Sequence, residues 1–542
     1  MSRSTRSNEL DMDAVWGELG QFGRYQVTIY LSILISILFS GIYLGQYIFA
    51  TGAVQYRCKV PECEVSPPEF DTDFWGVWAL PESGGRCDRL RPVGGGCGPG
   101  SFHANETLTC DSWVYERDHT IVAEFDLACE EWKRTLVGTI HSAGVFMALP
   151  ITAFISDNYG RRTALIMTAV AAGVAGVARA FSNSYVLYVV LEFVEATVGA
   201  GAYSTGFILA LEMVGVNRRV LGGNIISSTF ALGQVVVALT AWAFPYWRTL
   251  TLIIYAPSIL FILYIFVIEE SVRWLISKGR KKEAAKIIFK AAAINNKKLS
   301  PETIKILNDE SVVEEETKSP VKELPKKSLA VQVLRSKTIM TRLCVCCFWW
   351  ITLTFVYYGL SINSVSLAGN SYVNYILTSL VEIPGYCLSV LTMDRFGRKA
   401  SIMTAFIVCG LSLVGLPFVP ENIIWLQTTL NMIGKLCISM AFSSIYIYTS
   451  ELFPTEARHT LLGACSMIGR IGSLVAPQTP LLMTYMESLP YLIFGIMACT
   501  SGLLMLLTPE TLRVKLPDTI EQAENISKKP QNGTLNGVVT ST

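Results

Sequence analysis

The sequence predicts an all-α membrane protein with 12 transmembrane helices in two parallel six-helix repeats. Of its 542 residues, 51% are apolar and only 16% are charged, whereas soluble domains have about 25% charged residues. One spanning helix needs about 20 apolar residues, so this composition suffices for about a dozen spans. The formal net charge of +1 gives no indication of a nucleic-acid partner or a polyanionic substrate.

The apolar runs form two groups of six. The first run, 27–50, follows a polar segment, and no small-residue cleavage site comes after it, which indicates a retained span rather than a signal peptide. A Lys- and Glu-rich stretch separates the two groups, so we expect a long loop there. The other runs lie at 135–156, 163–181, 185–211, 220–244 and 249–268 in the first group, and at 341–362, 372–393, 401–419, 423–448, 460–485 and 489–508 in the second.

The distribution of Lys and Arg predicts the orientation of these spans, because connections that stay in the cytoplasm retain positive charge. Basic residues gather in alternate connections on one side, namely Arg161, Arg162, Arg218, Arg219, Arg395, Arg398, Lys399, Arg458, Arg513 and Lys515. We therefore expect a cytoplasmic N-terminal segment at 1–25, the first span at 26–48, a large extracellular loop at 49–133, spans two to six at 134–268, a cytoplasmic loop at 269–340, spans seven to twelve at 341–508 and a cytoplasmic tail at 509–542.

Six of the 14 cysteines fall in the 49–133 loop. An even number of cysteines in an oxidising compartment predicts three disulfides, without fixing their pairing, among Cys58, Cys63, Cys87, Cys97, Cys110 and Cys129. Asn105 begins an Asn-Glu-Thr glycosylation acceptor in the same loop. Cys344, Cys346 and Cys347 lie within an apolar run without a nearby His, so we interpret them as packing residues and predict no metal site.

A sequence motif is duplicated between the two groups of spans. Asp157-Asn-Tyr-Gly-Arg-Arg recurs 237 residues later as Asp394-Arg-Phe-Gly-Arg-Lys. Glu212 and Glu270, which follow the fourth and sixth runs, recur in nearly the same register as Glu451 and Glu510, which follow the tenth and twelfth. Such parallel repeats place a substrate near the bilayer midplane, between halves that rock to give alternating access.

These duplicated carboxylates and cations predict a gating network at the cytoplasmic interface. Positive-inside anchoring explains the arginines but not the aspartates that begin each motif, whereas ion pairs that bridge the two halves and break when the inner gate opens explain both. A glycine in each motif permits the tight turn. The predicted gating residues are Asp157, Gly160, Arg161, Arg162, Glu212, Arg218, Glu270, Arg273, Asp394, Gly397, Arg398, Glu451, Arg458 and Glu510.

The Asp-x-x-Gly-Arg-Arg/Lys motif in both halves resembles the signature of the major facilitator superfamily, which implies the major facilitator fold. Leu19-Gly-Gln-Phe-Gly-Arg-Tyr-Gln26, Glu270-Ser-Val-Arg-Trp-Leu275, Tyr448-Thr-Ser-Glu-Leu-Phe-Pro-Thr455 and Leu507-Thr-Pro-Glu-Thr511 resemble the organic cation, organic anion and carnitine transporter family. The resemblance extends from about residue 10 to 525. Two departures are Glu269, where the family usually has Pro, and Glu192, where many members carry Arg.

Charges within spans are costly unless paired or hydrated, which makes them functional candidates. Arg470 resembles the eleventh-span position where anion and carnitine transporters carry Arg and cation transporters carry Asp. A buried guanidinium offers a bidentate fork to a carboxylate; the alternative is a structural partnership with Glu382 or Glu195. Glu382 matches an acidic eighth-span residue that could hold an amine, and Tyr386, on the same helical face, resembles the carnitine-type members.

Further candidates surround this charged pair. Aromatic side chains could hold a quaternary ammonium through cation–π contacts, although packing is an open alternative for each, and Trp349 and Trp350 are also candidates for interface anchors. Lys435 lies either in the cavity or in a pair with a neighbouring span. Glu192 and Glu195 are possible coupling sites for sodium or a proton. The aromatic residues that resemble cavity positions of the family are Phe230, Tyr203, Trp350, Tyr357 and Tyr358.

Together these features favour a plasma-membrane secondary active or facilitative transporter of small organic ions without a cofactor. Zwitterionic or carboxylated substrates, carnitine-like or amino-acid-derived, are favoured, because Arg470 and Glu382 offer both charges. The alternatives are a broad organic cation or organic anion transporter and a non-transporting receptor with the same fold. An enzyme is disfavoured, because among four histidines His141 stands alone in a span and no catalytic grouping appears.

Overall fold

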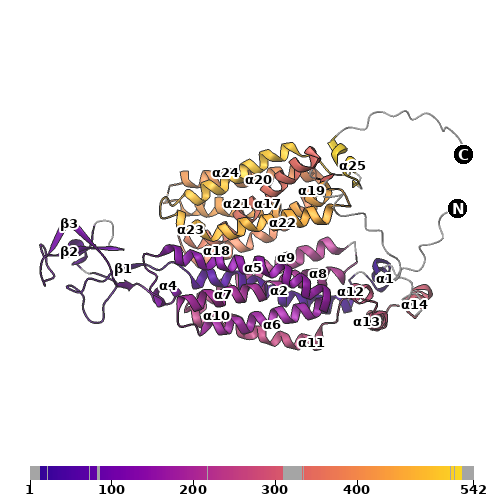
Figure 1. Cartoon of the computed structure of the whole chain (residues 1–542), viewed down its shortest axis with the longest axis horizontal. Helices are drawn as coiled ribbons and strands as arrows, with labels where there is room; N and C mark the ends of the chain where they lie inside the picture. Colours follow the sequence, from indigo (N-terminus) through magenta and orange to yellow (C-terminus); the bar gives the residue numbers. More distant parts are fainter. Residues whose placement is uncertain are drawn as a thin grey trace. The chain divides into compact units, whose positions relative to one another are not determined.

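The computed structural model describes residues 12–20, 22–72, 74–81, 86–215, 218–308, 332–333, 335–420, 422–512, 514, 516–517 and 519–527. Arg513 and Lys515 lie outside these residues. The described chain contains 12 helical segments that are long and apolar enough to cross a membrane, which confirms the predicted all-α fold class (Figure 1).

The first six spans contain α2 (Arg24–Ala50), α5 (Glu131–Tyr159), α6 (Arg161–Ala180), α7 and α8 (Tyr185–Gly199 and Gly201–Glu212), α9 (Arg219–Ala243), and α10, η2 and α11 (Trp247–Tyr255, Ala256–Leu263 and Tyr264–Val267). The last six contain α17 and η3 (Lys337–Asn363 and Ser364–Ser366), α18 and α19 (Ser371–Leu380 and Glu382–Phe396), α20 and η4 (Arg398–Gly415 and Leu416–Phe418), α21 (Ile424–Leu452), α22, η5 and α23 (Arg458–Val475, Ala476–Gln478 and Thr479–Leu482), and α24 and η6 (Leu489–Leu504 and Met505–Leu507).

The chain divides into two compact units. The first unit contains Met1–Lys318 together with the segments Ser361–Leu380 and Leu474–Glu487. The second unit contains Ser319–Leu360, Val381–Ser473 and Ser488–Thr542. The first unit therefore holds all of the first six spans, and it also holds one end of the seventh, eighth and eleventh.

Small residues set the helix packing in both units. In the first unit, Gly41 of α2 and Gly233 of α9 lie so close that a Cβ on either would overlap a backbone carbonyl of the facing helix. In the second unit, a Cβ on Gly410 of α20 would lie 2.8 Å from the carbonyl oxygen of Gly495 on α24, and the reverse distance is also 2.8 Å. Membrane helices use such residues to bring backbones into van der Waals contact, since lipid gives no hydrophobic driving force between helices.

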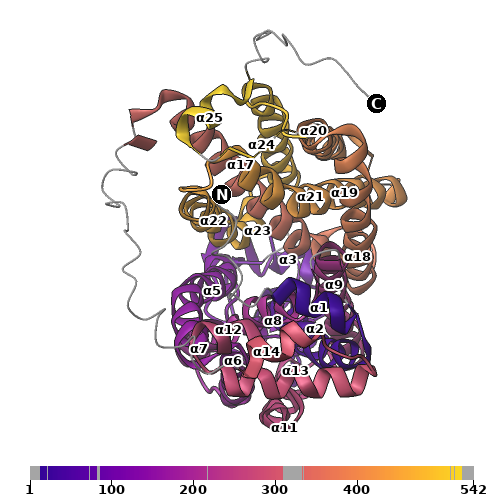
Figure 2. The ribbon, with the colours of Figure 1, turned by 90° about the vertical axis from the view of Figure 1, so that its right-hand side faces the viewer.

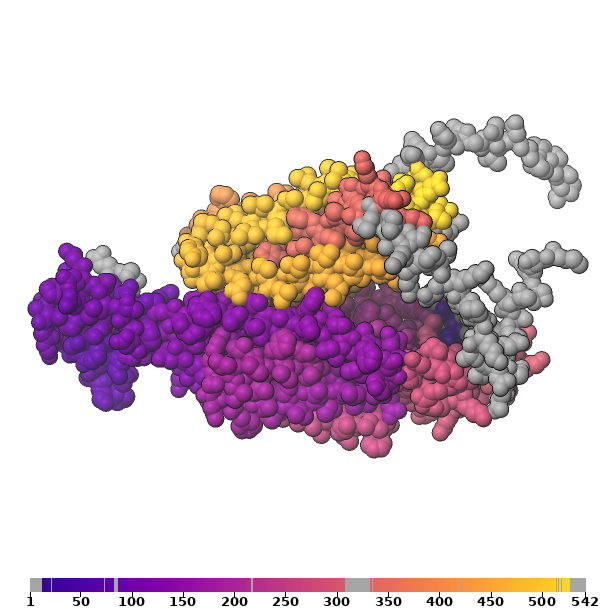
Figure 3. Space-filling view, viewed as in Figure 1, coloured from indigo at the N-terminus to yellow at the C-terminus, as the bar shows by residue number. Residues whose placement is uncertain are grey.

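The long first loop (residues 51–130) forms a separate lobe at one end of the first unit (Figure 3). It contains two antiparallel two-stranded sheets, which pair β1 (Tyr56–Cys58) with β4 (Trp113–Tyr115) and β2 (Asp88–Pro92) with β3 (Phe102–Thr109), and the short helices α3 (Gly76–Ala79) and α4 (Ile121–Glu124). The predicted disulfides are present as Cys58–Cys110, Cys63–Cys97 and Cys87–Cys129.

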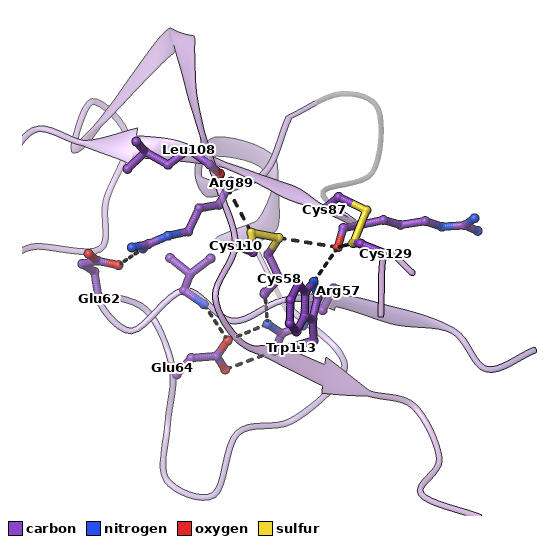
Figure 4. Close-up of a disulfide and its surroundings, with 12 residues drawn as sticks. Arg57, Cys58, Glu62, Glu64, Cys87, Arg89, Leu108, Cys110, Trp113 and Cys129 are labelled. Carbon is purple, nitrogen blue, oxygen red and sulfur yellow. Dashed lines mark hydrogen bonds and ion pairs between the residues drawn. A yellow bond between two sulfur atoms is a disulfide. The ribbon is translucent and has the colours of Figure 1, made fainter. Parts of the chain in front are cut away.

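A buried ion pair supports the disulfides of this lobe. Arg57 lies on β1 beside Cys58, and its guanidinium contacts the Glu64 carboxylate at 2.5 Å (Figure 4). Trp113 on β4 donates a hydrogen bond to the Arg86 carbonyl at 3.1 Å. Asn105 lies exposed on β3, so glycosylation at this residue remains a prediction that the structure permits.

Short helices gather at the opposite end of the first unit, namely α1 (Met12–Leu19), α12 (Val272–Ser277), α13 (Lys281–Asn295) and α14 (Pro301–Asn308) (Figure 2). Asn295 at the end of α13 ties them to α2, because its amide donates to the Leu19 carbonyl and to Gln26 and its oxygen accepts from the Tyr25 backbone. In the second unit, α25 is Ile520–Glu524.

At the end that carries the long first loop, the segments 361–380 and 474–487 pack directly on the first-half helices of their unit. Tyr372 stacks on Phe49 with ring centroids 5.6 Å apart. Gln478 exchanges hydrogen bonds with Thr135 and Thr139 at 3.0 and 2.7 Å. A cavity of about 430 Å³ lies beside these contacts.

Candidate functional site

The duplicated motif forms the same carboxylate cradle in each half. Gly160 joins α5 to α6 with φ of +103°, a backbone conformation that glycine adopts without strain. The turn directs the first backbone N–H groups of α6 at Glu270, whose Oε1 accepts from Arg161 at 2.8 Å and from Arg162 at 3.0 Å. A carboxylate at a helix N-terminus satisfies donors that the helix leaves free and complements its dipole.

The second copy has the same geometry. Gly397 joins α19 to α20, also with φ of +103°. Glu510 accepts from the backbone N–H groups of Arg398 and Lys399 at 2.9 and 3.0 Å. A Cβ on Gly397 would lie 2.6 Å from the Glu510 carboxylate, so the glycine is needed both for its backbone angles and for space.

An arginine in each cradle connects two further carboxylates. Arg161 lies 2.9 Å from Asp157 and 3.6 Å from Glu212. The corresponding distances from Arg398 to Asp394 and Glu451 are 2.9 and 3.6 Å. Every one of these contacts joins helices of the same half. The remaining predicted gating arginines lie nearby: Arg273 contacts Asp13 of α1, Arg458 donates to the Phe453 carbonyl, and Arg218 is exposed before α9.

A buried ion pair joins α19 and α21 in the second unit. Lys435 Nζ lies 3.0 Å from Glu382 Oε1, and both side chains are fully buried. Tyr357 and Tyr386 donate hydrogen bonds to Glu382 Oε2 at 2.7 and 3.1 Å. Lys435 was expected either in the cavity or in a pair with a neighbouring span, and the structure has the pair. The negative charge of Glu382 is therefore balanced within the protein.

A row of aromatic rings runs beside this pair. Trp350 packs edge-on against Tyr446 at 4.5 Å, and Phe442 lies 6.0 Å from Tyr446 and 5.1 Å from Tyr357. Tyr358 packs against Tyr357 at 5.2 Å. The structure therefore brings three predicted aromatic residues together and adds Tyr446 and Phe442 from α21, which the sequence analysis missed.

Neither tryptophan of the predicted anchor pair lies at a surface. Trp349 and Trp350 are fully buried and donate hydrogen bonds to the Ser501 carbonyl and the Thr449 hydroxyl. Interface anchoring is therefore wrong for both residues, because an anchor needs an exposed ring at the headgroup level.

Arg470 lies half-buried on α22, next to Gly469, which packs against the Trp350 backbone. It lies near the Tyr446 hydroxyl at the end of the aromatic row. Among the described residues of the second unit, no carboxylate lies within ion-pair distance of its guanidinium. Because Glu382 pairs with Lys435, the predicted alternative of a structural Arg470–Glu382 pair is wrong.

A second buried cluster lies in the first unit. Arg179 of α6 contacts both acidic residues of α7, Glu192 directly and Glu195 at 3.5 Å. His141 of α5 lies 2.8 Å from Glu192, and Gln46 of α2 accepts a hydrogen bond from Arg179 at 2.7 Å. His141 is therefore not solitary, because the helix packing gives it a carboxylate partner that its sequence neighbours lack. Arg179 lies inside the third apolar run, so it could have been recognised as a functional candidate in the same way as Glu195, because it is a charged residue within a span.

The same three acidic and histidine side chains have ligand atoms within 4.8 Å of one another. A divalent cation there would stand next to the Arg179 guanidinium, which already occupies the space between the two carboxylates. Like-charge repulsion in a buried site is costly, so we do not assign these residues as metal ligands.

Two remaining aromatic candidates lie together in the first unit. Tyr203 of α8 and Phe230 of α9 are both half-buried, and their rings are 5.1 Å apart in an edge-on arrangement. Their partly exposed faces distinguish them from fully packed core residues.

Twelve spans in two halves, each with the same cradle, define a transporter of the major facilitator class. The sequence profile of the Major Facilitator Superfamily matches residues 132–477 and 357–534. An inward-open structure of the xylose transporter XylE from E. coli superposes with a TM-score of 0.61, covering 93% of this chain and 100% of that chain at 15% sequence identity. At this identity the likeness shows the fold.

Curated relatives narrow the class. An organic cation transporter protein of Drosophila melanogaster is 34% identical over 530 residues, 96% of this chain and 95% of the relative. The organic cation/carnitine transporter 2 of Mus musculus is 31% identical over 534 residues, 94% of each chain. The chain therefore belongs to the organic cation, organic anion and carnitine transporter family of the major facilitator superfamily. It is a multi-pass membrane transporter and not an enzyme.

Proposed function

We propose that the protein carries small carboxylate-containing organic ions across the plasma membrane by alternating access, with zwitterions of carnitine-like or amino-acid-derived type favoured. The observation that supports this most is Arg470. Lys435, which is fully buried in the same unit, has a carboxylate partner, and the buried Arg342 donates to the Ala523 carbonyl, whereas Arg470 has no carboxylate partner among the unit's described residues. A half-buried guanidinium without a counter-ion is costly, and a substrate carboxylate would supply one in bidentate form.

The aromatic row is the proposed site for the positive end of a zwitterion. Glu382 already pairs with Lys435, so it offers a bound ammonium little net negative charge. The partly exposed rings of Tyr446 and Tyr358 can hold a quaternary ammonium by cation–π contacts, each worth about 0.5–2 kcal/mol, whereas the ring of Trp350 is fully buried and supports them from behind. Tyr203 and Phe230 are proposed as further aromatic contacts. The carboxylate then lies at Arg470.

The two cradles are proposed to act in gating. Each fixes the turn between two spans through a single carboxylate and an arginine, so each half can move as a rigid body when the gate opens. The basic residues at this end favour a cytoplasmic location for it and for both termini. The disulfides favour an external location for the long first loop.

Radiolabelled uptake in a heterologous cell tests the substrate class, with carnitine, β-alanine, a hippurate-type anion and tetraethylammonium, each with and without sodium. Arg470→Asp should abolish uptake of the carboxylated substrates while surface expression persists. Arg470→Lys should weaken uptake by about 10-fold to 150-fold, because a bidentate charge-assisted contact is worth about 1.5–3 kcal/mol. Arg280→Asp, at an exposed arginine just before α13, is the control.

The second candidate is an organic cation transporter, which the names of both relatives favour. It requires a site without an uncompensated cation, and Arg470 argues against it. Strong tetraethylammonium uptake without uptake of any carboxylated substrate would establish this candidate. Retained carboxylate uptake by Arg470→Asp would instead assign the arginine a structural role.

A further inference from the structure

We propose that the buried cluster of Arg179, His141, Glu192 and Glu195 binds one exchangeable proton, with Glu195 as the protonated carboxyl, and that this proton is the coupling ion of transport. The proposal rests on the proposed function for its coupling role, but proton binding itself is a property of the protein alone. The cluster lies in the first unit, and the carboxylate-binding arginine proposed above lies in the second.

The charge of the cluster does not balance without a proton. Arg179 contributes one positive charge, and the two glutamates contribute two negative charges when both are ionised. Neutral His141 leaves a net charge of −1. Glu192 and Glu195 are each only 1% exposed, and Arg179 is fully buried. An uncompensated charge in such a place is strongly disfavoured, whereas one proton makes the cluster neutral.

The hydrogen bonds select Glu195 as the residue that holds the proton. Glu192 is engaged on both oxygens, by His141 on Oε1 and by Arg179 on Oε2. Oε2 of Glu195 is buried, faces Arg179 at 3.5 Å and has no hydrogen-bond partner among the described residues. A neutral carboxyl tolerates a buried oxygen without a donor better than an ionised carboxylate does, so Glu195 rather than Glu192 is the expected holder of the proton.

The remaining neighbours of Glu195 do not supply the missing charge. From α10, the Tyr255 ring lies under the Arg179 guanidinium at 5.0 Å, and its hydroxyl lies near Glu195. From α2, Tyr43 and Gln46 face the cluster, and Tyr43 donates its own hydroxyl to Ser258. Tyrosines and glutamine are neutral at physiological pH, so His141 and Arg179 are the only described side chains next to Glu195 that can carry positive charge.

A proton fits this place better than sodium. Sodium requires several oxygen ligands arranged around it, and the guanidinium of Arg179 already fills the side of Glu195 that the carboxylates share. A cation there meets like-charge repulsion at short range. A proton needs only one oxygen, and its exchange adds or removes one O–H bond without displacing any side chain.

Proton binding is tested on the purified protein without a substrate. Infrared difference spectra between about pH 5.5 and 8.5 should show the C=O stretch of a protonated carboxyl that disappears at high pH, in a range where ordinary Asp and Glu are ionised throughout. Glu195→Gln, which has the shape of the protonated side chain, should lack this band. Glu487→Gln, at an exposed glutamate, should keep it. A wild-type spectrum without the band, or an unchanged band in Glu195→Gln, overturns the proposal.

Coupling is tested in proteoliposomes with carnitine and β-alanine at zero membrane potential. For one proton per substrate, the equilibrium accumulation ratio should rise about tenfold for each unit of inward pH difference. Glu195→Gln should keep substrate exchange but give a ratio near one at every pH difference. Accumulation driven by sodium and not by the pH difference, or pH-driven accumulation that survives in Glu195→Gln, overturns the coupling role. If the wild type transports neither substrate, the proposed function fails, and the infrared result still decides proton binding.

Discussion

Breaking the Glu382–Lys435 pair is the sharpest test of the second unit. Glu382→Gln leaves the Lys435 ammonium fully buried without a counter-ion, and Lys435→Met leaves a buried carboxylate. Removing one partner of a buried pair costs about 3–5 kcal/mol, a factor of roughly 150 to 5,000 in the folding equilibrium. At about 1 °C per kcal/mol for a chain of 542 residues, we expect each single variant to melt about 3–5 °C lower in detergent.

The double variant separates the pair from its surroundings. Glu382→Gln combined with Lys435→Met removes both charges, and the glutamine oxygen can still accept the hydrogen bond from Tyr357. Replacing both partners is often neutral or stabilising, so the double variant should recover most of the lost stability. Lys290→Met, which breaks the exposed pair with Glu269, is the control, with an expected cost of about 0–1 kcal/mol.

Thermal melting and uptake together decide the result. A double variant as unstable as the single variants would refute the view that charge pairing is what the two residues contribute. A double variant that recovers its stability and still takes up carnitine supports the aromatic row as the ammonium site. If the double variant recovers its stability, loses carnitine uptake and keeps normal uptake of a hippurate-type anion, Glu382 rather than the aromatic row is the binding site of the substrate ammonium.

Two further predictions concern the cradles and the long first loop. Alanine at Gly160 or at Gly397 should lower the free energy of unfolding by about 1–3 kcal/mol, because both glycines have φ of +103° and face a carboxylate. The two variants should also reduce uptake to a similar extent, and unequal losses of uptake would contradict the equivalence of the halves. Gly463→Ala, where a Cβ meets nothing within 4 Å, is the control. Burial alone would raise the pKa of Glu124, but hydrogen bonds led by Arg248 outweigh it and the pKa is lowered. Its contribution to stability is therefore present above the unfolded-state pKa of about 4.3 and lost as the pH falls, so between about pH 7 and 3 the melting temperature should fall more for the wild type than for Glu124→Gln.

The number of spans was predictable from local sequence, and the residues of the cradles were predictable because their motif is duplicated, although Glu270 lies 109 residues after Arg161. A span needs only a long apolar run, and a cradle needs a glycine between two helices with a carboxylate at a fixed later position. Gly160 and Gly397 could be recognised from the repeat alone, and their equal backbone angles confirm that the repeat is structural.

The interior contacts were not predictable in the same way. The pairing of Lys435 with Glu382 depends on which faces of α19 and α21 meet. Both helices carry apolar residues on all sides, so the spacing of their apolar residues does not indicate which face packs against a neighbouring helix. His141 and Glu192 are 51 residues apart, and only the packing of α5 on α7 brings them together. The disulfide connectivity was open for the same reason, since six cysteines allow 15 pairings.

The duplication and the buried charges describe different parts of the mechanism. The cradles are equivalent in both halves, so the repeat preserves the parts that hold each half rigid at one end. The buried charges are not equivalent. Among the described residues, the cluster of the first unit has one negative charge more than it has positive charges, and the second unit has a balanced pair and Arg470 without a carboxylate. A proton would neutralise the cluster, and a substrate carboxylate would neutralise Arg470. Because these two uncompensated charges are opposite in sign and lie on different halves, loading both sites neutralises both, which gives a physical reason for a proton and a carboxylate to cross in the same cycle.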